Sequence, residues 1–503
     1  MSIAAAPGSP GVPRRNRADF GRACIDPFTN GRRHRITQKS GDPNPRPARR
    51  RRKAWRLAVV DSIANRNQRL NIAVVGTGIA GLSAAWLLSR GHDVTVYERA
   101  SRLGGHSNTI MVPGPQSSTP VDMGFIVYNP DAYPNLVALF RELAVPTRAS
   151  DMSFAASLRD GGLEYSGTDL NGVFAQRGNL LRPRFWSMLR DLLRFYREAP
   201  EAARSSGAET QSLGNWLAAH GYGDAFIRDH LLPMAAAIWS MPADRMAAYP
   251  AAAFMRFYEN HGLLRLKDRP QWRTVEGGSQ EYVRRLAAPF ADRIRLGCGV
   301  RRIRRDANSV AISDTSGEEA HYDHVVIGAH SDQALAMLQD ATPEEQQLLG
   351  AIRYGANAAV MHRDPSLMPR RRKVWASWNY LEQGPSRELC TTYWMNQLQD
   401  LQGQRDVFVT LNPVREPASG SVIHREDYEH PRFDMAALRA QHQLWALQGR
   451  RRTWFCGAWF GAGFHEDGVQ AGLAVAEELG GICRPWSVPN ASGRIVGLRA
   501  QAA

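Results

Sequence analysis

The chain has 503 residues, of which 43% are hydrophobic and 22% charged, a composition typical of a globular protein with a large core and two domains. Its net charge of +15 would favour a nucleic-acid-binding protein if the charge were spread over the surface. Residues 1–70, however, hold 17 Lys and Arg against 4 Asp and Glu, which leaves a net charge of only +2 for the other residues. We therefore expect no nucleic-acid partner for the folded part.

The first segment, residues 1–69, is rich in Pro, Gly and Arg, and it contains the run RRRRK at residues 49–53. Without apolar periodicity it is predicted to be a disordered basic tail. Three interpretations remain open: a targeting arm, a basic anchor for anionic lipid or nucleic acid, and a dispensable extension. The segment lacks the apolar stretch of a secretory signal, and its prolines interrupt a transit helix, so we expect a cytoplasmic protein.

A strand–helix–strand unit follows the tail. Strands are predicted at Asn71–Val75 and Asp93–Tyr97, and a helix is predicted at Leu82–Ser89. The motif GTGIAG occupies Gly76–Gly81, between the first strand and the helix, and an acidic residue, Glu98, ends the second strand. This spacing predicts a dinucleotide-binding βαβ unit, against the alternative of a glycine-rich structural turn.

Each glycine of the motif has a physical task. Gly76 allows the tight turn, Gly78 lets the backbone touch a pyrophosphate, and Gly81 lets the helix pack on the strand. The N–H groups at the start of the helix, including those of Ile79 and Ala80, would face the phosphates.

The run ERASRLGGH continues from the acidic residue into a glycine pair, as if the backbone met a second stretch of the same extended ligand. The carboxylate of Glu98 would accept hydrogen bonds from an adenosine ribose, and its charge argues against a 2′-phosphate. The residues of this run expected to contact the cofactor are Glu98, Arg99, Arg102, Gly104, Gly105 and His106.

The middle of the chain is predicted to form helices with broad apolar faces at residues 184–198, 212–219, 230–241 and 251–258. Aromatic and Met side chains in such helices usually belong to the core. An apolar substrate also needs a channel, and its candidate lining residues are Trp239, Met241, Phe254 and Phe257.

Near the C-terminus, residues 454–473 read WFCGAWFGAGFHEDGVQAGL, which predicts a strand, a loop and a helix. This stretch resembles the last flavin-binding strand, loop and helix of the flavin-containing amine oxidase superfamily. The resemblance implies that Asp467 caps the helix and that N–H groups near Gly468, Val469 and Gln470 point at the flavin ring and stabilise its reduced form. Trp459, Phe460 and Phe464 are candidates to hold a substrate carbon against that ring. His465 is the candidate acid or base, with an ordering role in the loop as the alternative.

These motifs together resemble the flavin-containing amine oxidase superfamily over most of residues 70–485. The resemblance implies FAD as a noncovalent cofactor, the glycine pair beside its pyrophosphate and ribityl chain, and Val300 at the adenine. Gly457 would belong to the flavin-binding loop, where Ala458 stands in place of a common Glu and His106 in place of a common Arg. Phrases such as FIVYN, SDMSF, WNYL, YWMN and FHEDG resemble more narrowly the bacterial NAD/FAD-binding proteins associated with cyclopropane-fatty-acid synthases.

The implied fold is α/β, with a Rossmann-type parallel sheet interleaved with an α+β substrate domain. The expected FAD-binding parts are residues 70–130, 271–335 and 451–485, and the expected substrate parts are residues 131–270, largely helical, and 336–450. Residues 486–503 are expected to form a C-terminal tail.

Three functions remain open. The first is an FAD-dependent oxidase or dehydrogenase that moves a hydride from an apolar, fatty-acyl or lipid substrate to flavin N5, with a peripheral membrane contact among its partners. The second is an amine oxidase, and the third is a flavin-bearing partner of a lipid-modifying methyltransferase. The pair His321 and His324 has metal spacing only on a helix, and in the strand predicted there we expect no metal site.

Overall fold

A computed structural model describes residues 69–114, 117–204, 211–239, 243–383 and 388–498. The predicted basic tail therefore lies outside the described residues, apart from its last position. Within the described ranges, no helix is both long and apolar enough to cross a membrane.

A five-stranded parallel sheet forms the base of the cofactor-binding part. Its strand order is β10 (Ile294–Arg295), β2 (Asp93–Tyr97), β1 (Asn71–Val75), β14 (His324–Ile327) and β20 (Thr453–Phe455). The strands are short and their central side chains are buried, as expected for a parallel sheet covered on its faces by helices. Three segments of the chain, far apart in sequence, thus build one sheet.

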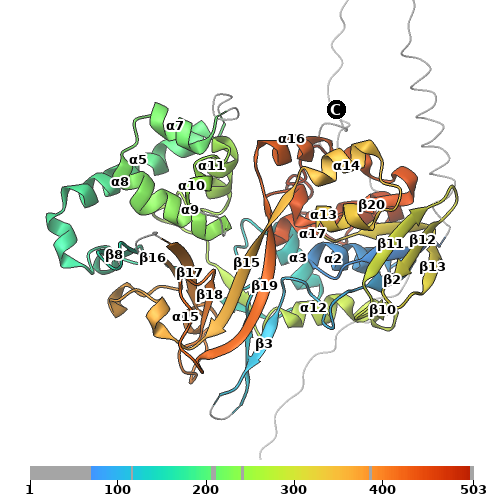
Figure 1. Cartoon of the computed structure of the whole chain (residues 1–503), viewed down its shortest axis with the longest axis horizontal. Coiled ribbons are helices and arrows are strands. Elements are labelled where there is room, and N and C mark those ends of the chain that lie inside the picture. The colour runs from blue at the N-terminus through green and yellow to red at the C-terminus, as the bar shows by residue number, and fades with distance from the viewer. Residues whose placement is uncertain (1–68, 115–116, 205–210, 240–242, 384–387, 499–503) are drawn as a thin grey trace, which may run out of the picture. The chain divides into compact units, whose positions relative to one another are not determined.

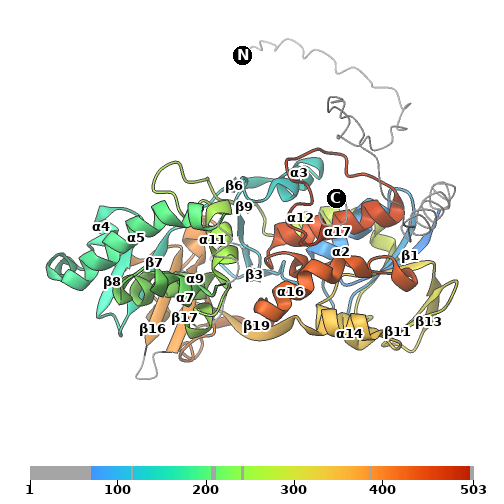
Figure 2. The ribbon, with the colours of Figure 1, turned by 90° about the horizontal axis from the view of Figure 1, so that it is seen from above.

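Helix α2 (Ile79–Leu88) follows β1, and all ten of its residues are buried. It packs closely against the C-terminal helix α17 (His465–Gly480), as Figures 1 and 2 show. A Cβ on Gly472 of α17 would lie 2.2 Å from the carbonyl oxygen of Ala80, so only glycine permits this approach. The close contact holds the last segment of the chain against the first.

An antiparallel three-stranded sheet adjoins the parallel sheet, with β11 (Val300–Arg305), β12 (Val310–Asp314) and β13 (Glu319–Tyr322) in that order. Smaller pairings join β3 to β4 and both β5 and β6 to β9. Their bounds are β3 Thr109–Val112, β4 Thr119–Asp122, β5 Val127–Tyr128, β6 Thr147–Ala149 and β9 Arg273–Val275.

The second part of the molecule is built on a seven-stranded sheet. Its order is β19 (Val422–Arg432), β15 (Arg353–His362), β18 (Phe408–Leu411), β17 (Glu388–Trp394), β16 (Trp378–Gln383), β7 (Phe154–Leu158) and β8 (Leu163–Ser166). Helix α9 (Leu232–Trp239) contacts β16, and Figure 1 shows it among the green helices beside the orange strands.

The other helices of the second part are α4 Leu170–Val173, α5 Pro183–Ala202, α7 Leu213–Ala219, α8 Asp224–Phe226, α10 Ala243–Met246, α11 Ala251–Asn260 and α15 Met395–Leu398, with a π-turn at Ile227–Leu231. Those nearer the parallel sheet are α3 Pro134–Glu142, α12 Gln280–Ala287, α13 Ser331–Met337, α14 Pro343–Gly350 and α16 Met435–Leu444. Short 3₁₀ turns lie at Arg177–Leu181, Ala288–Arg293, Pro365–Leu367, Arg372–Val374, Trp445–Leu447, Arg450–Arg452 and Ala458–Phe460.

The expected fold class is confirmed: a parallel dinucleotide-binding sheet is interleaved with an α+β part. The expectation of a C-terminal tail is wrong for residues 486–498. Trp486 stacks on Trp86 with ring centroids 5.8 Å apart, and Ile495 is buried. Apolar side chains in this segment fasten it to the folded core, which the charge-poor sequence pattern did not reveal.

Candidate active site

One cavity of about 1310 Å³ runs from the cofactor-binding sheet into the second part of the molecule. Both glycine motifs border it, and so do segments of the seven-stranded sheet and its helices. The predicted site residues that line it are Gly76, Gly78, Ile79, Ala80, Glu98, Arg99, Gly104, Gly105, His106, Val300, Gly457, Trp459, Phe464 and His465. Gly81, Arg102, Phe460, Asp467, Gly468 and Val469 do not line it.

The first glycine motif forms a cradle that a side chain would fill. Gly78 precedes α2, and a Cβ built on it meets no atom within 4 Å, because it would enter the cavity. A Cβ on Gly81, by contrast, would lie 2.1 Å from the carbonyl oxygen of Gly76. Gly105 completes the cradle from the opposite side, since its Cβ would lie 3.2 Å from the Cα of Gly78. The backbone thus fits a pyrophosphate next to the N-terminus of a buried helix.

Glu98 lies at the end of β2 and borders the cavity. Its carboxylate accepts hydrogen bonds from the backbone N–H of Thr77 at 2.9 Å and from that of Ala100 at 2.8 Å. These bonds fix the carboxylate and leave further lone pairs for ribose hydroxyls. Arg99 and Val300 continue the wall past this point, so the predicted adenosine end of the site is assembled in one place.

His106 does not supply the positive charge that a basic residue would bring to this position. Its ring stacks on Tyr428, with centroids 4.9 Å apart, and lies 5.2 Å from the ring of His430. Burial, and then the neighbouring imidazoles, lower the pKa of His106 well below its usual range. The ring is therefore neutral, and its buried Nε2 has no protein partner among the described residues, which leaves it available to a ligand.

Arg102 also differs from the prediction. Its guanidinium donates to the carbonyl oxygen of Gly105 at 2.8 Å and pairs with Glu426 at 3.4 Å. Arg102 therefore supports the glycine pair Gly104–Gly105 from outside the cavity. A long arginine side chain can bind either a ligand or another part of the protein, and the local sequence does not determine which.

The helix after the C-terminal loop begins earlier than predicted. Helix α17 starts at His465, and Asp467 accepts hydrogen bonds from the N–H groups of Phe464 at 2.8 Å and Ala462 at 3.1 Å. The N–H of Gly468 is already bonded to the carbonyl oxygen of Phe464. The N–H groups free of intrahelical partners therefore belong to the first turn from His465, and the assignment of Gly468 and Val469 to the flavin ring is wrong.

His465 lines the cavity, but its ring is tied to the protein. Its Nε2 lies 3.1 Å from the Ser107 hydroxyl and 3.2 Å from the Tyr282 hydroxyl, and the ring stacks on Phe125 at 3.7 Å. Burial lowers the pKa of His465 to about 3. The ring is neutral near pH 7, an arrangement that favours an ordering role, and its catalytic role stays a prediction.

The three aromatic residues of the C-terminal loop separate into two groups. Trp459 and Phe464 border the cavity, and the indole N–H of Trp459 donates to the carbonyl oxygen of Ala329 at 3.1 Å. Phe464 stacks on Phe257 with centroids 4.7 Å apart. Phe460 is 1% exposed and packs on Trp445 in the core, so it is not brought to the substrate side.

Beyond the cofactor cradle, the cavity continues as what we call the substrate arm. One face of the π-turn and α9 borders it with His230, Met234 and Ile238, which follow one another at four-residue spacing. Of the predicted channel residues, Trp239 and Phe257 line the cavity, Phe254 is buried in the core, and Met241 lies outside the described residues. Lining residues that the sequence did not single out as such include Met152, Phe154, His261, Trp272, Trp378 and Tyr393.

The histidines of the arm are uncharged near neutral pH. Burial lowers the pKa of His230 to about 4 and that of His261 to about 3. The Nδ1 of His261 lies 2.9 Å from the carbonyl oxygen of Phe257, so it carries the proton, and the partnerless Nε2 carries the lone pair. Apart from the charged side chains of Arg269 and Asp151, the arm is walled by apolar, aromatic and neutral groups.

These lowered pKa values predict acid sensitivity. His230, His261 and His465 have the ordinary histidine pKa of 6.5 in the unfolded chain and values of about 4, 3 and 3 when folded, so the unfolded chain binds more protons below pH 6.5. Their contribution to stability is present above pH 6.5 and falls as the pH is lowered toward the folded values. We expect the melting temperature to drop over this range, and the slope to be shallower in His261→Gln; equal slopes in the two proteins would contradict the assignment.

A parallel dinucleotide-binding sheet, a phosphate cradle and an apolar arm that meets it define a two-part flavoprotein, and FAD is the expected cofactor. The chain belongs to the flavin-containing amine oxidoreductase family, whose model matches residues 79–368. It is similar to a putative flavin-containing monoamine oxidase, AofH, of Mycobacterium tuberculosis, with 31% identity over 304 residues. That match covers 58% of this chain and 64% of the relative, which is less than two thirds of the relative's length.

Solved structures share the fold. Cyclohexylamine oxidase from Brevibacterium oxydans IH-35A is 18% identical with a TM-score of 0.59, and the match covers 82% of this chain and 100% of that one. A fatty acid isomerase from P. acnes that produces CLA is 16% identical with a TM-score of 0.57, over 82% of this chain and 98% of that one. At this level of identity the two structures establish the architecture and leave the substrate open.

Proposed function

We propose that the protein is an FAD-dependent oxidoreductase that takes a hydride from a fatty-acyl or similar lipid chain. The observation that carries this proposal is the wall of the substrate arm. Met234, Ile238 and Trp272 are typical of its lining, and its histidines are neutral. Such a wall suits a long uncharged chain, because most of its surface is apolar or neutral and offers few groups that hold water.

A single cation distinguishes one side of the arm. Arg269 borders the cavity in the loop after α11, and its Nε donates to the carbonyl oxygen of Arg265 at 2.7 Å. Its remaining N–H groups can bind the carboxylate or phosphate of a lipid head. Asp151 also borders the cavity, but its carboxylate already accepts from the N–H of Ser153 at 2.9 Å and the hydroxyl of Ser377 at 2.7 Å.

The chain's own residues chiefly hold the substrate in place. Bound FAD would accept the hydride, and the proton lost from the neighbouring carbon, which leaves a C=C bond, would pass to the Nε2 lone pair of His261 or to water. Trp459 and Phe464 border the cofactor end of the arm with apolar surface, while hydrogen bonds between the Nε2 of His465 and the hydroxyls of Ser107 and Tyr282 hold the loop in position.

A second candidate is oxidation of an amine. It is favoured by the 31% identity with the relative named as a monoamine oxidase and by the aromatic contact between Phe257 and Phe464, which could pack on an amine. The positive charge of Arg269 opposes a cationic substrate. The third interpretation, a flavin-bearing partner of a lipid-modifying methyltransferase, predicts copurification with that enzyme and no turnover of lipids.

Anaerobic reduction of the flavin separates these functions. We expect the yellow holoprotein to lose colour with fatty acids or phospholipids and to keep it with polyamines or aryl amines. Because Arg269 loses a charge-assisted contact with the head group, Arg269→Ala should raise the lipid concentration needed for half-maximal reduction about tenfold.

Arg265→Ala is the matched control, because Arg265 is an exposed neighbour whose side chain does not line the cavity and whose carbonyl oxygen remains. Bleaching by amines alone would favour the amine oxidase. If both substitutions raised the lipid concentration for half-maximal reduction equally, Arg269 would not be the residue that binds the head group.

A further inference from the structure

Exposed apolar side chains gather on one stretch of the second part. Of the nine large hydrophobic residues that are exposed among the described residues, five lie between positions 170 and 193. They belong to α4, the turn after it and α5. We call this set the α5 patch: Leu170 (76% exposed), Leu180 (44%), Leu181 (88%), Trp186 (49%) and Leu193 (51%).

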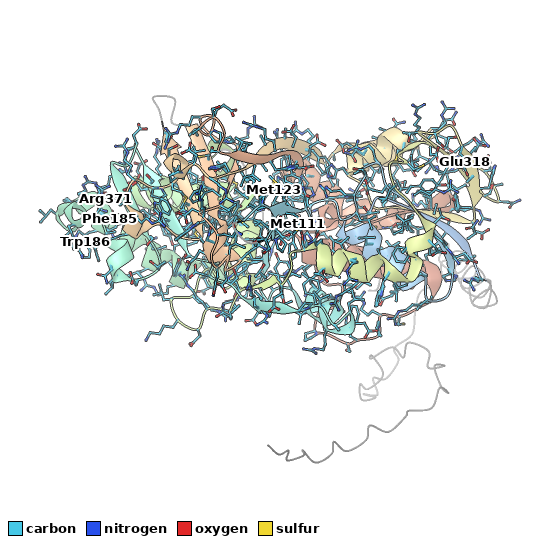
Figure 3. The ribbon with its side chains drawn as sticks, turned by 90° about the horizontal axis from the view of Figure 1, so that it is seen from below. Met111, Met123, Phe185, Trp186, Glu318 and Arg371 are labelled. Carbon is cyan, nitrogen blue, oxygen red and sulfur yellow. The ribbon has the colours of Figure 1, made fainter. Side chains whose placement is uncertain are left out.

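The α5 patch is built into the fold. The indole N–H of Trp186 donates to the carbonyl oxygen of Leu180 at 2.9 Å, which holds the ring on the turn. Helix α5 buries Phe185 and Phe195 on its inner face. Trp186 on the same helix is nevertheless exposed, at the end of the molecule where Figure 3 labels it, and the exposed Leu193 follows two turns later. Hydrophobic residues on both faces are unusual for a helix that is covered on one side only.

Cations surround these apolar side chains. Residues 169–198 contain six Arg and three acidic residues, Asp169, Asp191 and Glu198. Three of the six arginines form ion pairs: Arg184, Arg190 and Arg194. Arg177, Arg182 and Arg197 are exposed, and none of them has an ion pair within the part of the chain that the structure describes. The surface beside Leu181 is therefore positively charged, which complements an anionic surface.

A second basic run reaches the same place. The hairpin between β7 and β8 accepts hydrogen bonds through Gly162 from Arg182 and through Gly161 from Arg371. Arg371 belongs to the run RRRK at residues 370–373, whose side chains are exposed. The guanidinium of Arg371 also pairs with the buried carboxylate of Glu164 at 2.6 Å. Figure 3 labels Arg371 and Trp186 on the same end of the molecule.

The substrate arm extends to the elements that carry the patch. Gly167 and Thr168 line the cavity immediately before α4, two residues ahead of the exposed Leu170. Tyr196 lines it from α5, and its hydroxyl oxygen accepts a hydrogen bond from Arg269. The outer end of the cavity thus lies beneath the apolar surface.

We propose that the α5 patch docks on an anionic phospholipid bilayer, so that a lipid chain enters the substrate arm directly from the membrane. Leu and Trp side chains insert among the acyl chains, and the surrounding arginines bind lipid phosphates. The docking surface follows from exposure and charge, and the entry of a substrate rests on the proposed function. A bilayer fits better than a protein partner because the exposed apolar side chains lie among arginines, three of which, Arg177, Arg182 and Arg197, have no ion pair among the described residues. This arrangement matches acyl chains below a phosphate layer.

Local insertion can be measured in the full chain, where the basic tail could bind the same vesicles. Leu181→Cys and, as a control that is exposed but lies outside the patch, Met111→Cys are labelled with an environment-sensitive NBD dye. The unsubstituted protein gives the background of the native cysteines. With phosphatidylcholine–phosphatidylglycerol vesicles we expect a blue shift and a brighter signal at position 181 only. An equal response at both positions, or none at position 181, would overturn the proposal.

Vesicle sedimentation at high salt, which screens the tail, supplies the second measurement. The double variant Leu181→Asp/Leu193→Asp should lower the vesicle-bound fraction about tenfold, because two apolar anchors become charged, while Met111→Asp should leave it unchanged. Flavin content and the turnover of detergent-dispersed substrate should not change in either variant. A dimer in solution that the double variant converts to monomers, without vesicle binding, would make the patch a contact between copies and overturn the proposal.

Insertion and catalysis can fail separately. If Leu181 inserts into vesicles but no lipid reduces the flavin, the proposed docking surface stands and the proposed function is wrong. If the protein oxidises detergent-dispersed lipid but Leu181 does not insert into vesicles, the proposed function stands and the docking surface is wrong.

Discussion

Gly78→Val is expected to give a folded protein that retains no FAD. The new side chain would enter the cradle in front of α2, where a Cβ meets no protein atom within 4 Å, so it collides with the cofactor's pyrophosphate rather than with the chain. Loss of the phosphate contacts at the helix N-terminus should weaken binding by at least about 100-fold. The flavin absorbance per mole of purified protein measures the result, and far-UV circular dichroism checks the fold.

Gly178→Val is the matched control, because a Cβ on Gly178 also meets no atom within 4 Å and that residue lies outside the cavity. It should leave the protein yellow. Gly81→Val should behave differently from both, since its Cβ would overlap the backbone of Gly76 and destabilise the fold itself. A yellow Gly78→Val protein of normal stoichiometry would disprove the cradle.

Met234→Trp is expected to close the substrate arm to long chains. Met234 projects from α9 into the cavity between His230 and Ile238, and an indole there would take up the space that a chain needs. We expect kcat/KM for a long-chain lipid to fall at least about 100-fold, because the reacting carbon can no longer reach its position. A short-chain substrate should retain most of its rate, and flavin content should stay normal.

Leu232→Trp provides the comparison on the same helix, because Leu232 is only partly buried and does not line the cavity. It should affect long and short chains alike and only weakly. If Met234→Trp slowed both chain lengths equally, the arm would not be the path of the chain.

Local motifs explain why much of the cofactor site could be predicted from the sequence. Residues within one short unit, the GTGIAG stretch, determine the turn, the phosphate contact and the packing of the helix. Gly76, Gly78 and Gly81 occupy the positions that the motif requires. Only one helix and one strand separate Glu98 from the glycine motif, so the position of Glu98 also follows from local structure. The family, the FAD cofactor and the fold class followed from such units.

Long-range packing explains what could not be predicted. The start of α17 depends on Asp467 bonding back to Phe464, and the sequence allowed Asp467 equally well as the first cap. The neutral state of His106 depends on Tyr428 and His430, which come from a strand more than 300 residues away. Glu466 is similar, since it accepts the backbone N–H of Leu136 at 2.9 Å in a contact that no local pattern indicates.

The arm shows the same limit. Phe125, Phe154, Trp378 and Tyr393 belong to short phrases that were notable in the sequence, and all four border the cavity. Phe154, Trp378 and Tyr393 converge because β7 pairs with β16 and β16 pairs with β17, which brings separate phrases to one wall. Such pairings are set by tertiary contacts, so the sequence phrases indicated the protein family but not the position of their residues in the cavity.

The position of β20 has a consequence for biosynthesis. This strand pairs with β14, which pairs in turn with β1, so the ribosome must deliver Thr453–Phe455 before the sheet can be finished. Nascent chains halted ahead of that point would expose one edge of β14 and lack the helix that covers α2. Cofactor capture is thereby postponed until β20 and α17 have been synthesised, and chains that lack them should emerge without flavin and prone to aggregate.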